Sequence, residues 1–339
     1  MESRLEQYLK KVMNGVEELQ VTELNRMTEG YSYETYIFRA QWQEKGENVS
    51  REFAMRMEPE AGVVEPYDVR PQYWVLNALE NTPVPTPKVH WLESDPETLG
   101  RPFFIMEKVE GEVPIPWGFE EHEVFQDPRK RKQMGHNLIE VLAHLHMADW
   151  KGLGLDKRLE VSEPGTGPAR KEIERWEQNL RKFHLGPEPI LTETLLWLKE
   201  NMPVAPRLTL THGDYRLGNF IWDGKRINAF LDWEMVAVGD PMSDLGWLCM
   251  KNWRPSEPSQ VCSLLEKEEA LSYYQELTGI EVDEKSVFYW EVFSHFKLAV
   301  IIICGVKSYI DKKNTDLRLL TINPIYLLDI EEIINLLEF

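Results

Sequence analysis

The chain has 339 residues, 42% hydrophobic and 28% charged, a balance typical of a soluble globular protein with one large domain or two lobes. Its 38 lysine and arginine residues face 57 aspartate and glutamate residues, which gives a net charge of −19. This acidic balance disfavours nucleic acid and anionic membrane surfaces as partners, so we expect neither.

The first third of the chain is predicted to mix strands with helices. Alternating apolar and polar residues indicate strands, and apolar residues three or four positions apart indicate helices. These patterns predict a helix over 3–19, strands over 36–42 and 51–57, a helix over 68–80, and strands over 88–93 and 102–108. We therefore expect residues 1–110 to form a small mixed β-sheet lobe.

Residues 111–339 are predicted to be mainly helical, so the whole chain is expected to have an α+β fold. The helical pattern covers 126–148, 169–184, 190–201, 241–252, 264–278, 284–310 and 322–338. Two short apolar runs, 220–222 and 227–231, flank the turn residues 223–226. They predict a hairpin that interrupts the helices.

The cellular compartment is expected to be the cytoplasm. The three cysteines, Cys249, Cys262 and Cys304, show no metal-ligand spacing and are predicted to be reduced core residues. The polar residues 1–6 lack the apolar core of a signal peptide, and the apolar run 298–306 is too short to cross a bilayer. A buried helix explains that run better. The sequence does not indicate an oligomeric state.

The segment 211–219 (THGDYRLGN), followed by 230–234 (FLDWE), contains the most informative residues. Asn219 lies five positions after Asp214, and Asp232 lies thirteen positions after Asn219, at the far end of the predicted hairpin. A carboxylate at Asp214 is suited to accept the proton of a hydroxyl group during phosphoryl transfer.

Asn219 and Asp232 are the predicted ligands of Mg²⁺. This ion takes few protein oxygens because phosphates and water fill the rest of its octahedral shell. A metal-dependent hydrolase also uses clustered acids, but such a site typically has several His or Asp ligands at two-metal distance. Taken separately, each of these motif elements is ordinary, because His-Gly-Asp forms turns and single carboxylates are usually solvated.

With Gly239-Asp240-Pro241 and Asp244-Leu245-Gly246, this region resembles the aminoglycoside phosphotransferase and choline kinase-like superfamily. More closely, it is similar to bacterial phosphotransferases related to the kinase-like domains of some acyl-CoA dehydrogenases. The resemblance implies a two-lobed protein-kinase-like fold, with lobes 1–110 and 111–339 joined by a hinge near 107–111. It also implies transfer of phosphate from ATP, or from GTP, to an alcohol group of a small molecule with Mg²⁺.

The resemblance also implies residues that contact the nucleotide. Gly30, Ser32 and Thr35 match the family's phosphate-covering loop, whereas Glu29 and Tyr33 replace a Gly and an Asn. A glutamate near phosphates would repel them, so either Glu29 points away or the loop binds differently.

Arg56 occupies the strand position where related kinases keep a Lys or Arg for the phosphates. Its usual partner, a Glu on the following helix, is replaced by Gln72. A neutral amide can still orient Arg56, but the ion pair would be absent. In the hinge, Glu107 and Val109 are expected to contact adenine through their backbones, and Met106 to form a wall of its site.

Several polar residues near the motif are given supporting roles. His146 and His212 are interpreted as structural, and Asp240 and Asp244 as residues that cap the next helix and fix the loop. Arg216 follows Asp214 by two positions and is expected to face either the phosphate or the acceptor.

The acceptor itself is left open by the sequence. The subgroup resemblance implies 4-hydroxyacyl-CoA thioesters, whose phosphorylation activates the hydroxyl group for elimination. An aminoglycoside or macrolide kinase would share the same catalytic residues, with an acidic acceptor cleft favouring aminoglycosides and a basic channel favouring CoA. A non-catalytic nucleotide-binding protein is the third alternative, because of Glu29 and Gln72.

Overall fold

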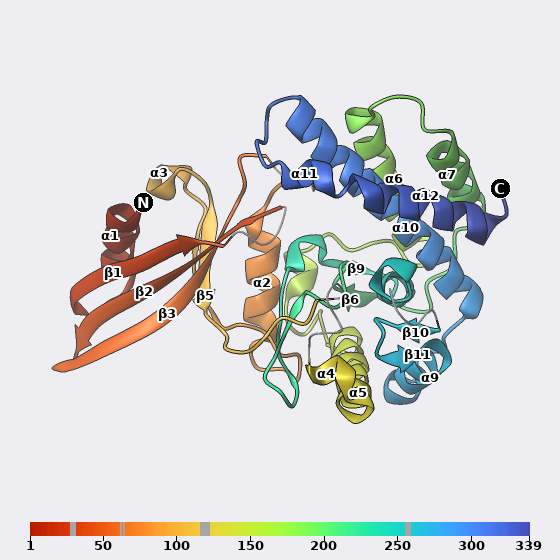
Figure 1. Cartoon of the computed structure of the whole chain (residues 1–339). Coiled ribbons are helices and arrows are strands. Elements are labelled where there is room, and N and C mark those ends of the chain that lie inside the picture. The colour runs from red at the N-terminus through yellow and green to blue at the C-terminus, as the bar shows by residue number, and fades with distance from the viewer. Residues whose placement is uncertain (28–31, 62, 64, 116–122, 255–258) are drawn as a thin grey trace.

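The computed structural model describes residues 1–27, 32–61, 63, 65–115, 123–254 and 259–339. It has a small lobe built on a five-stranded sheet and a larger, mainly helical lobe (Figure 1). The predicted two-lobed α+β fold is confirmed. The lobe boundary near 107–111 stays a prediction.

The sheet of the small lobe is antiparallel throughout, with strand order β1-β2-β3-β5-β4. Its strands are β1 (Glu17–Arg26), β2 (Glu34–Glu44), β3 (Glu47–Met57), β4 (Val89–Glu93) and β5 (Phe103–Glu107). Alternate residues of β2, from Tyr36 to Trp42, are buried because successive side chains of a strand point to opposite faces. Two helices accompany the sheet: α1 (Glu2–Val12) packs against β1, and α2 (Val69–Leu79) lies between the sheet and the large lobe (Figure 1).

The predicted helix over 3–19 is wrong beyond Val12. Gly15 has a φ of 74°, and the chain then continues as β1, in which Leu19 and Val21 are buried. The pairing of β1 with β2 therefore prevails over the helical spacing of the apolar residues in this segment.

The large lobe contains most of the predicted helices. Those described are α4 (Glu123–Gln126), α5 (Pro128–His146), α6 (Gly167–Phe183), α7 (Pro189–Glu200), α8 (Met242–Leu248), α9 (Lys267–Thr278), α10 (Glu284–Ile310), α11 (Arg318–Thr321) and α12 (Asn323–Leu337); the short α3 (Pro96–Leu99) belongs to the small lobe. The helix predicted over 241–252 ends at Leu248, where the chain turns before a 3₁₀ turn at Lys251–Trp253.

Three short antiparallel pairs interrupt these helices. The predicted hairpin is present as β7 (Phe220–Trp222) and β8 (Ile227–Phe230). Two further pairs were not predicted: β6 (Thr209–Thr211) with β9 (Ala237–Gly239), and β10 (Gln260–Val261) with β11 (Leu265–Glu266). The β6–β9 pair carries the residues on either side of the 211–234 motif.

Helix α10 is the central helix of the large lobe. Its 27 residues extend well beyond the apolar run 298–306 and are long and apolar enough to cross a membrane by length and composition alone. However, 89% of its most apolar window is buried inside the protein, which is typical of a core helix. The predicted burial of all three cysteines is confirmed, and all three are free thiols.

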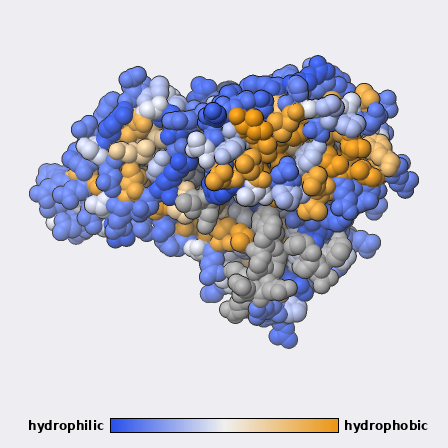
Figure 2. Space-filling model, turned by 45° about the horizontal axis from the view of Figure 1, so that its top comes forward, coloured by the Kyte–Doolittle hydropathy of each residue, from blue (hydrophilic) through white to orange (hydrophobic). Residues whose placement is uncertain are grey.

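The surface of the large lobe carries apolar side chains over the region of α11 and α12 (Figure 2). Exposed leucines there include Leu317, Leu327 and Leu328. Nothing in the structure indicates what covers this face.

Candidate active site

The loop between β6 and β7 carries His212, Gly213 and Asp214 and is held from beneath by Asp244 of α8. The buried Asp244 carboxylate accepts the backbone N–H of His212 at 2.8 Å and that of Gly213 at 2.8 Å. Its Oδ2 also lies 3.0 Å from Nε2 of the buried His146. Asp244 therefore anchors the loop, as the sequence predicted, but it lies within α8, and Asp240 is the residue that accepts the backbone N–H of Met242 at the start of that helix. His146 supports Asp244.

His212 joins the loop to the strand hairpin. Its Nδ1 accepts the backbone N–H of Asp214 at 3.2 Å, so its Nε2 carries the proton that reaches the Leu231 carbonyl oxygen at 2.9 Å. Burial lowers the pKa of His212, which keeps the ring neutral. Both ring nitrogens are thus occupied, and His212 braces the loop.

The carboxylate of Asp214 lies at the centre of a hydrogen-bond network. Its Oδ1 accepts Nε–H of Arg216 at 2.9 Å and Nε1–H of Trp247 at 2.8 Å, and its Oδ2 accepts Nδ2–H of Asn219 at 2.6 Å. Burial alone would raise the pKa of Asp214, but the positive charge of Arg216 and the hydrogen bond from Asn219 hold it below the usual value. Asp214 is therefore ionised and oriented at neutral pH.

Asn219 and Asp232 lie at the two open ends of the β7–β8 hairpin. Phe220 pairs with Phe230, and the backbone N–H of Leu231 donates to the Asn219 carbonyl oxygen at 2.7 Å. Asp232 adopts a left-handed conformation, with φ 65° and ψ 62°, immediately after the hairpin. The predicted convergence of the two ends is therefore present.

These two residues fit a Mg²⁺ site. Asn219 turns its amide nitrogen toward Asp214, which leaves its side-chain oxygen for another partner. An amide oxygen and a carboxylate are ligands that Mg²⁺ takes alongside phosphates and water. In the described parts of the chain, no group of three or more His, Cys, Asp or Glu side chains is arranged to hold a metal, so the pattern of a multi-ligand metal hydrolase is not found there.

Arg56 of β3 reaches across from the small lobe. Its Nη2 donates to Asp232, its Nη1 donates to Thr35 Oγ1 at 3.1 Å, and its guanidinium lies 5.2 Å from the centre of the Tyr33 ring. Glu234 lies 4.0 Å away. Burial, with repulsion from Asp232, raises the pKa of Glu234 to about 8, although Arg56 opposes this rise.

The expectation that Gln72 orients Arg56 is wrong. Among the described residues, the hydrogen bonds of the Arg56 guanidinium go to Thr35 and Asp232 and not to Gln72. Gln72 itself is buried at 2% exposure. Arg56 instead forms an ion pair with Asp232 of the large lobe. The ion pair within the small lobe, which the replacement of Glu by Gln72 predicts to be absent, is thus replaced by one between the lobes.

A cavity of about 390 Å³ is lined by half of the predicted nucleotide residues and by the predicted metal ligand Asp232. The predicted residues that line it are Thr35, Arg56, Gln72, Met106 and Asp232. The adjoining wall is apolar and includes Leu76, Phe104 and Phe230, as expected for a planar base. Ser32, Glu107 and Val109 are not in its lining, and Gly30 and Glu29 lie outside the described residues.

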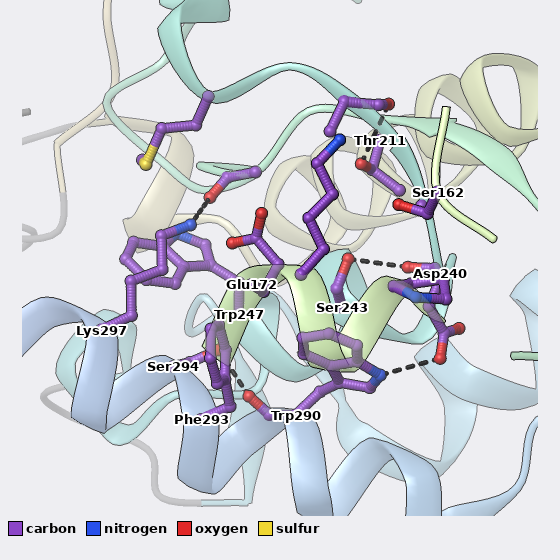
Figure 3. Close-up of a pocket in the computed structure, with 16 residues that line it drawn as sticks. Ser162, Glu172, Thr211, Asp240, Ser243, Trp247, Trp290, Phe293, Ser294 and Lys297 are labelled. Atoms are coloured by element: carbon purple, nitrogen blue, oxygen red, sulfur yellow. Dashed lines mark hydrogen bonds between the residues drawn. The ribbon is translucent and has the colours of Figure 1, made fainter. Parts of the chain in front are cut away.

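A second cavity, of about 530 Å³, opens on the large-lobe side of the catalytic loop (Figure 3). Gly213 and Met235 form part of its lining, together with residues of α6, α8 and α10. Trp247 and Lys297 line this cavity and contact the catalytic loop. From the sequence, Trp247 is expected to be a core residue, with an apolar acceptor pocket as the alternative, and Lys297 has no predicted site role. The only signal for Lys297 in the sequence is its position within an otherwise apolar segment.

The family model described as the phosphotransferase enzyme family matches residues 28–277. The chain belongs to this family. Among curated proteins, the chain is 29% identical over 259 residues to acyl-CoA dehydrogenase family member 10 of Mus musculus, covering 74% of the chain and 22% of that protein. It is 27% identical over 266 residues to family member 11 of Rattus norvegicus, covering 74% of the chain and 33% of that protein. The chain therefore spans about a fifth to a third of the length of these relatives.

Solved structures share the fold of this chain. A Ralstonia eutropha protein named a "putative aminoglycoside phosphotransferase" has a TM-score of 0.70 at 24% identity, over 97% of both chains. Macrolide 2′-phosphotransferase type I has a TM-score of 0.59 at 16% identity, over 98% of this chain and 96% of that one. An aminoglycoside phosphotransferase solved with AMP-PNP and hygromycin B has a TM-score of 0.58 at 16% identity, over 99% and 98%.

Proposed function

We propose that this phosphotransferase transfers the γ-phosphoryl group of ATP to a hydroxyl group of a small molecule in a Mg²⁺-dependent reaction. The observation that carries the proposal is the Asp214 carboxylate, which Arg216, Asn219 and Trp247 hold in place by hydrogen bonds. Asp214 orients the acceptor hydroxyl and takes its proton late in the transfer. When bound by Asn219 and Asp232, Mg²⁺ would neutralise charge on the phosphates. ATP is proposed before GTP because a structural neighbour was solved with AMP-PNP.

For the acceptor we propose a hydroxyacyl compound, such as a hydroxyacyl-CoA thioester. The second cavity contains Lys171 and Lys297 beside Glu172 and Asp240, so it is not the wholly acidic cleft that suits a polycationic aminoglycoside. Similarity to acyl-CoA dehydrogenase family members supports an acyl substrate, although the chain spans only part of those proteins.

A non-catalytic nucleotide-binding role has less support. The neutral Gln72 leaves Arg56 without its usual partner on α2, but Asp232 supplies a carboxylate in its place. The chain contains the three residues that the chemistry needs. Asp214 lies on the loop before β7, and Asn219 and Asp232 lie at the two open ends of the β7–β8 hairpin.

A screen with γ-³²P-labelled ATP and Mg²⁺ tests the proposal, with hydroxyacyl-CoAs, hydroxy acids, aminoglycosides, macrolides and amino alcohols as acceptors. We expect label to be transferred to a hydroxyacyl compound by the wild type and not by Asp214→Ala, which should still bind nucleotide. Equal turnover by wild type and Asp214→Ala would exclude the mechanism. Nucleotide binding without labelling of any acceptor would favour the non-catalytic role.

A further inference from the structure

Lys297 is a buried cation that contacts the catalytic loop from α10. The residue is 5% exposed, and its Nζ donates a hydrogen bond to the Gly213 carbonyl oxygen at 2.6 Å (Figure 3). Its ammonium group also lies 4.5 Å from the centre of the Trp247 ring and 5.7 Å from that of Trp176. In the part of the chain that the structure describes, no carboxylate forms an ion pair with Lys297.

A buried ammonium group without an ion pair is costly, so its presence in the core needs a reason. Burial lowers the pKa of Lys297, and the charges of Glu172 and Asp214 oppose the change. The Gly213 carbonyl oxygen and the two indole rings favour the charged form, but they do not neutralise it. An apolar side chain of similar length would fill this space at a lower cost, which indicates a role for the charge.

The hydrogen bond from Lys297 orients the peptide unit that leads into Asp214. This peptide unit consists of the carbonyl group of Gly213 and the N–H group of Asp214. Lys297 binds the carbonyl oxygen, and Nδ1 of His212 accepts the N–H at 3.2 Å. Both sides of the peptide unit are therefore held, which fixes the direction in which the Asp214 side chain leaves the backbone.

Trp247 links the same ammonium group to the carboxylate of Asp214. The indole Nε1–H donates to Oδ1 of Asp214 at 2.8 Å, and the Lys297 ammonium lies over the same ring. A cation over an indole ring withdraws electron density and makes its N–H a stronger donor, because polarised neighbours strengthen one another. Lys297 therefore acts on Asp214 by two routes, through the backbone and through the carboxylate.

The packing of α8 against α10 determines where Lys297 lies. The two helices approach so closely at Gly246 that an added Cβ would lie 2.5 Å from the carbonyl carbon of Trp290. Lys297 follows Trp290 by seven positions, which is about two turns along the same face of α10. Trp247 follows Gly246 directly, so this close contact brings Lys297 and Trp247 together.

We propose that Lys297 is a positioning residue of the phosphoryl transfer, which holds the peptide unit before Asp214 and the Trp247 indole and so aims the Asp214 carboxylate at the acceptor hydroxyl. This inference rests on the proposed function and adds a residue of α10 to its machinery. Hydrogen bonds from Arg216, Trp247 and Asn219 occupy three of the roughly four lone-pair sites of the carboxylate, which leaves one for the hydroxyl group. A misplacement of about 1 Å can lower a rate about 100-fold.

The indole N–H signals of the ¹⁵N-labelled full chain test this role by NMR without turnover. The Trp247 signal is assigned by its absence from Trp247→Phe. In Lys297→Met, which keeps an unbranched side chain without its charge, this signal should move upfield and exchange with water at least about tenfold faster, because the hydrogen bond is weaker. Lys297→Arg should retain part of the wild-type shift. An unchanged Trp247 signal in a folded Lys297→Met would overturn the proposal.

Turnover shows whether this geometry matters for the transfer. Hydrolysis of Mg²⁺-ATP, with water in place of the acceptor, is measured for each variant. Lys297→Met should lower kcat about 10- to 100-fold and keep KM for ATP within about twofold, because Lys297 does not line the cavity that contains Arg56. Lys297→Arg should recover part of kcat. A lower free energy of unfolding with unchanged kcat would mean that Lys297 only stabilises the fold, and would overturn the proposal.

The matched control is Lys307→Met, on the same helix but at the surface and paired with Asp311 at 2.6 Å. Its Trp247 signal and its kcat should equal those of the wild type. If Lys297→Met does not fold, the wild type provides the test. Its Lys297 ammonium protons should exchange slowly with water and show nuclear Overhauser effects with the Trp247 ring. Rapid exchange of every lysine ammonium group would overturn the proposal.

The two proposals fail in different ways. If the Trp247 signal depends on Lys297 but the wild type neither hydrolyses ATP nor phosphorylates an acceptor, the phosphotransfer proposal fails and the link from Lys297 to Asp214 stands. If the wild type is active, Asp214→Ala is inactive and Lys297→Met is fully active, this inference fails and the phosphotransfer proposal stands.

Discussion

The guanidinium group of Arg56 donates a hydrogen bond to the carboxylate of Asp232 and so links strand β3 of the small lobe to the hairpin of the large lobe. In the proposed reaction the first residue binds phosphate and the second binds Mg²⁺. Without nucleotide, each charge neutralises the other. Mg²⁺-ATP supplies a partner for both, so the same two side chains are held ready on either side of the cavity.

The first prediction follows from this pair. Arg56→Met should weaken Mg²⁺-ATP binding about 10- to 100-fold, because a charge-assisted hydrogen bond contributes about 1.5–3 kcal/mol. Calorimetric titration measures the effect. Arg39→Met is the control, because Arg39 lies on the neighbouring strand β2 in exposed ion pairs with Glu23 and Glu52. Equal affinity in wild type and Arg56→Met would contradict a phosphate-binding role.

The second prediction concerns the pH dependence of turnover. Arg216 is the strongest influence that lowers the pKa of Asp214, and burial opposes it. In Arg216→Gln burial remains, so the pKa of Asp214 should rise and the acidic limb of the rate profile should move to higher pH. The same lowered pKa contributes stability that is present above the ordinary Asp pKa of about 3.9 and is lost as pH falls through the lower folded-state value.

Profiles of kcat/KM against pH for wild type and Arg216→Gln measure this shift, whatever the change in absolute rate. Arg226→Gln is the control, because Arg226 is exposed at the hairpin turn beside Asp223. Its profile should match that of the wild type. Coincident acidic limbs in all three proteins would mean that Arg216 does not set the ionisation of Asp214.

The third prediction concerns the anchor beneath the loop. The Asp244 carboxylate accepts hydrogen bonds from the backbones of His212 and Gly213 and lies beside the His146 ring. In Asp244→Asn, an N–H₂ donor replaces one of these acceptor oxygens and faces another donor. Loss of such a buried charged acceptor should lower the free energy of unfolding by about 2–4 kcal/mol. Urea denaturation measures it. Asp311→Asn, in a surface pair with Lys307, should cost less than about 1 kcal/mol. Similar costs for both variants would refute the anchoring role.

The sequence predicts the local part of the site and misses the part made by packing. Asp214, Asn219 and Asp232 are close in the chain, and the turn between two apolar runs is enough to predict the hairpin that joins them. Trp247 and Lys297 reach the loop only because α8 and α10 pack together, which no local pattern encodes. The three-residue strands β6 and β9 are likewise too short to show a period of two.

The mismatch at Gln72 has a similar cause. Its replacement of the expected Glu is visible in the sequence, but the new partner of Arg56 is not. That partner, Asp232, comes from the other lobe, and the ion pair depends on how the two lobes meet. The local preference of residues for helix or strand predicts single elements. It does not predict contacts between segments that are distant in the chain.

The fourth prediction compares two glycines in the same backbone region. Gly213 has a φ of 82°, and an added Cβ would lie 2.5 Å from the Met235 carbonyl oxygen. Gly224, at the tip of the β7–β8 hairpin, has a φ of 92°, and nothing lies within 4 Å of an added Cβ. Gly224→Ala should therefore cost only the backbone strain, about 1–2 kcal/mol, and should keep kcat.

Gly213→Ala should cost more stability than Gly224→Ala and should also lower kcat. Relief of its clash must move either Met235 or the loop, and Asp214 is the next residue of that loop. Denaturation curves and kcat for both variants separate the two contributions, because the strain is shared and the clash belongs to Gly213 alone. If both variants lost equal stability and kept full kcat, the close contact between Gly213 and Met235 would not determine the position of Asp214.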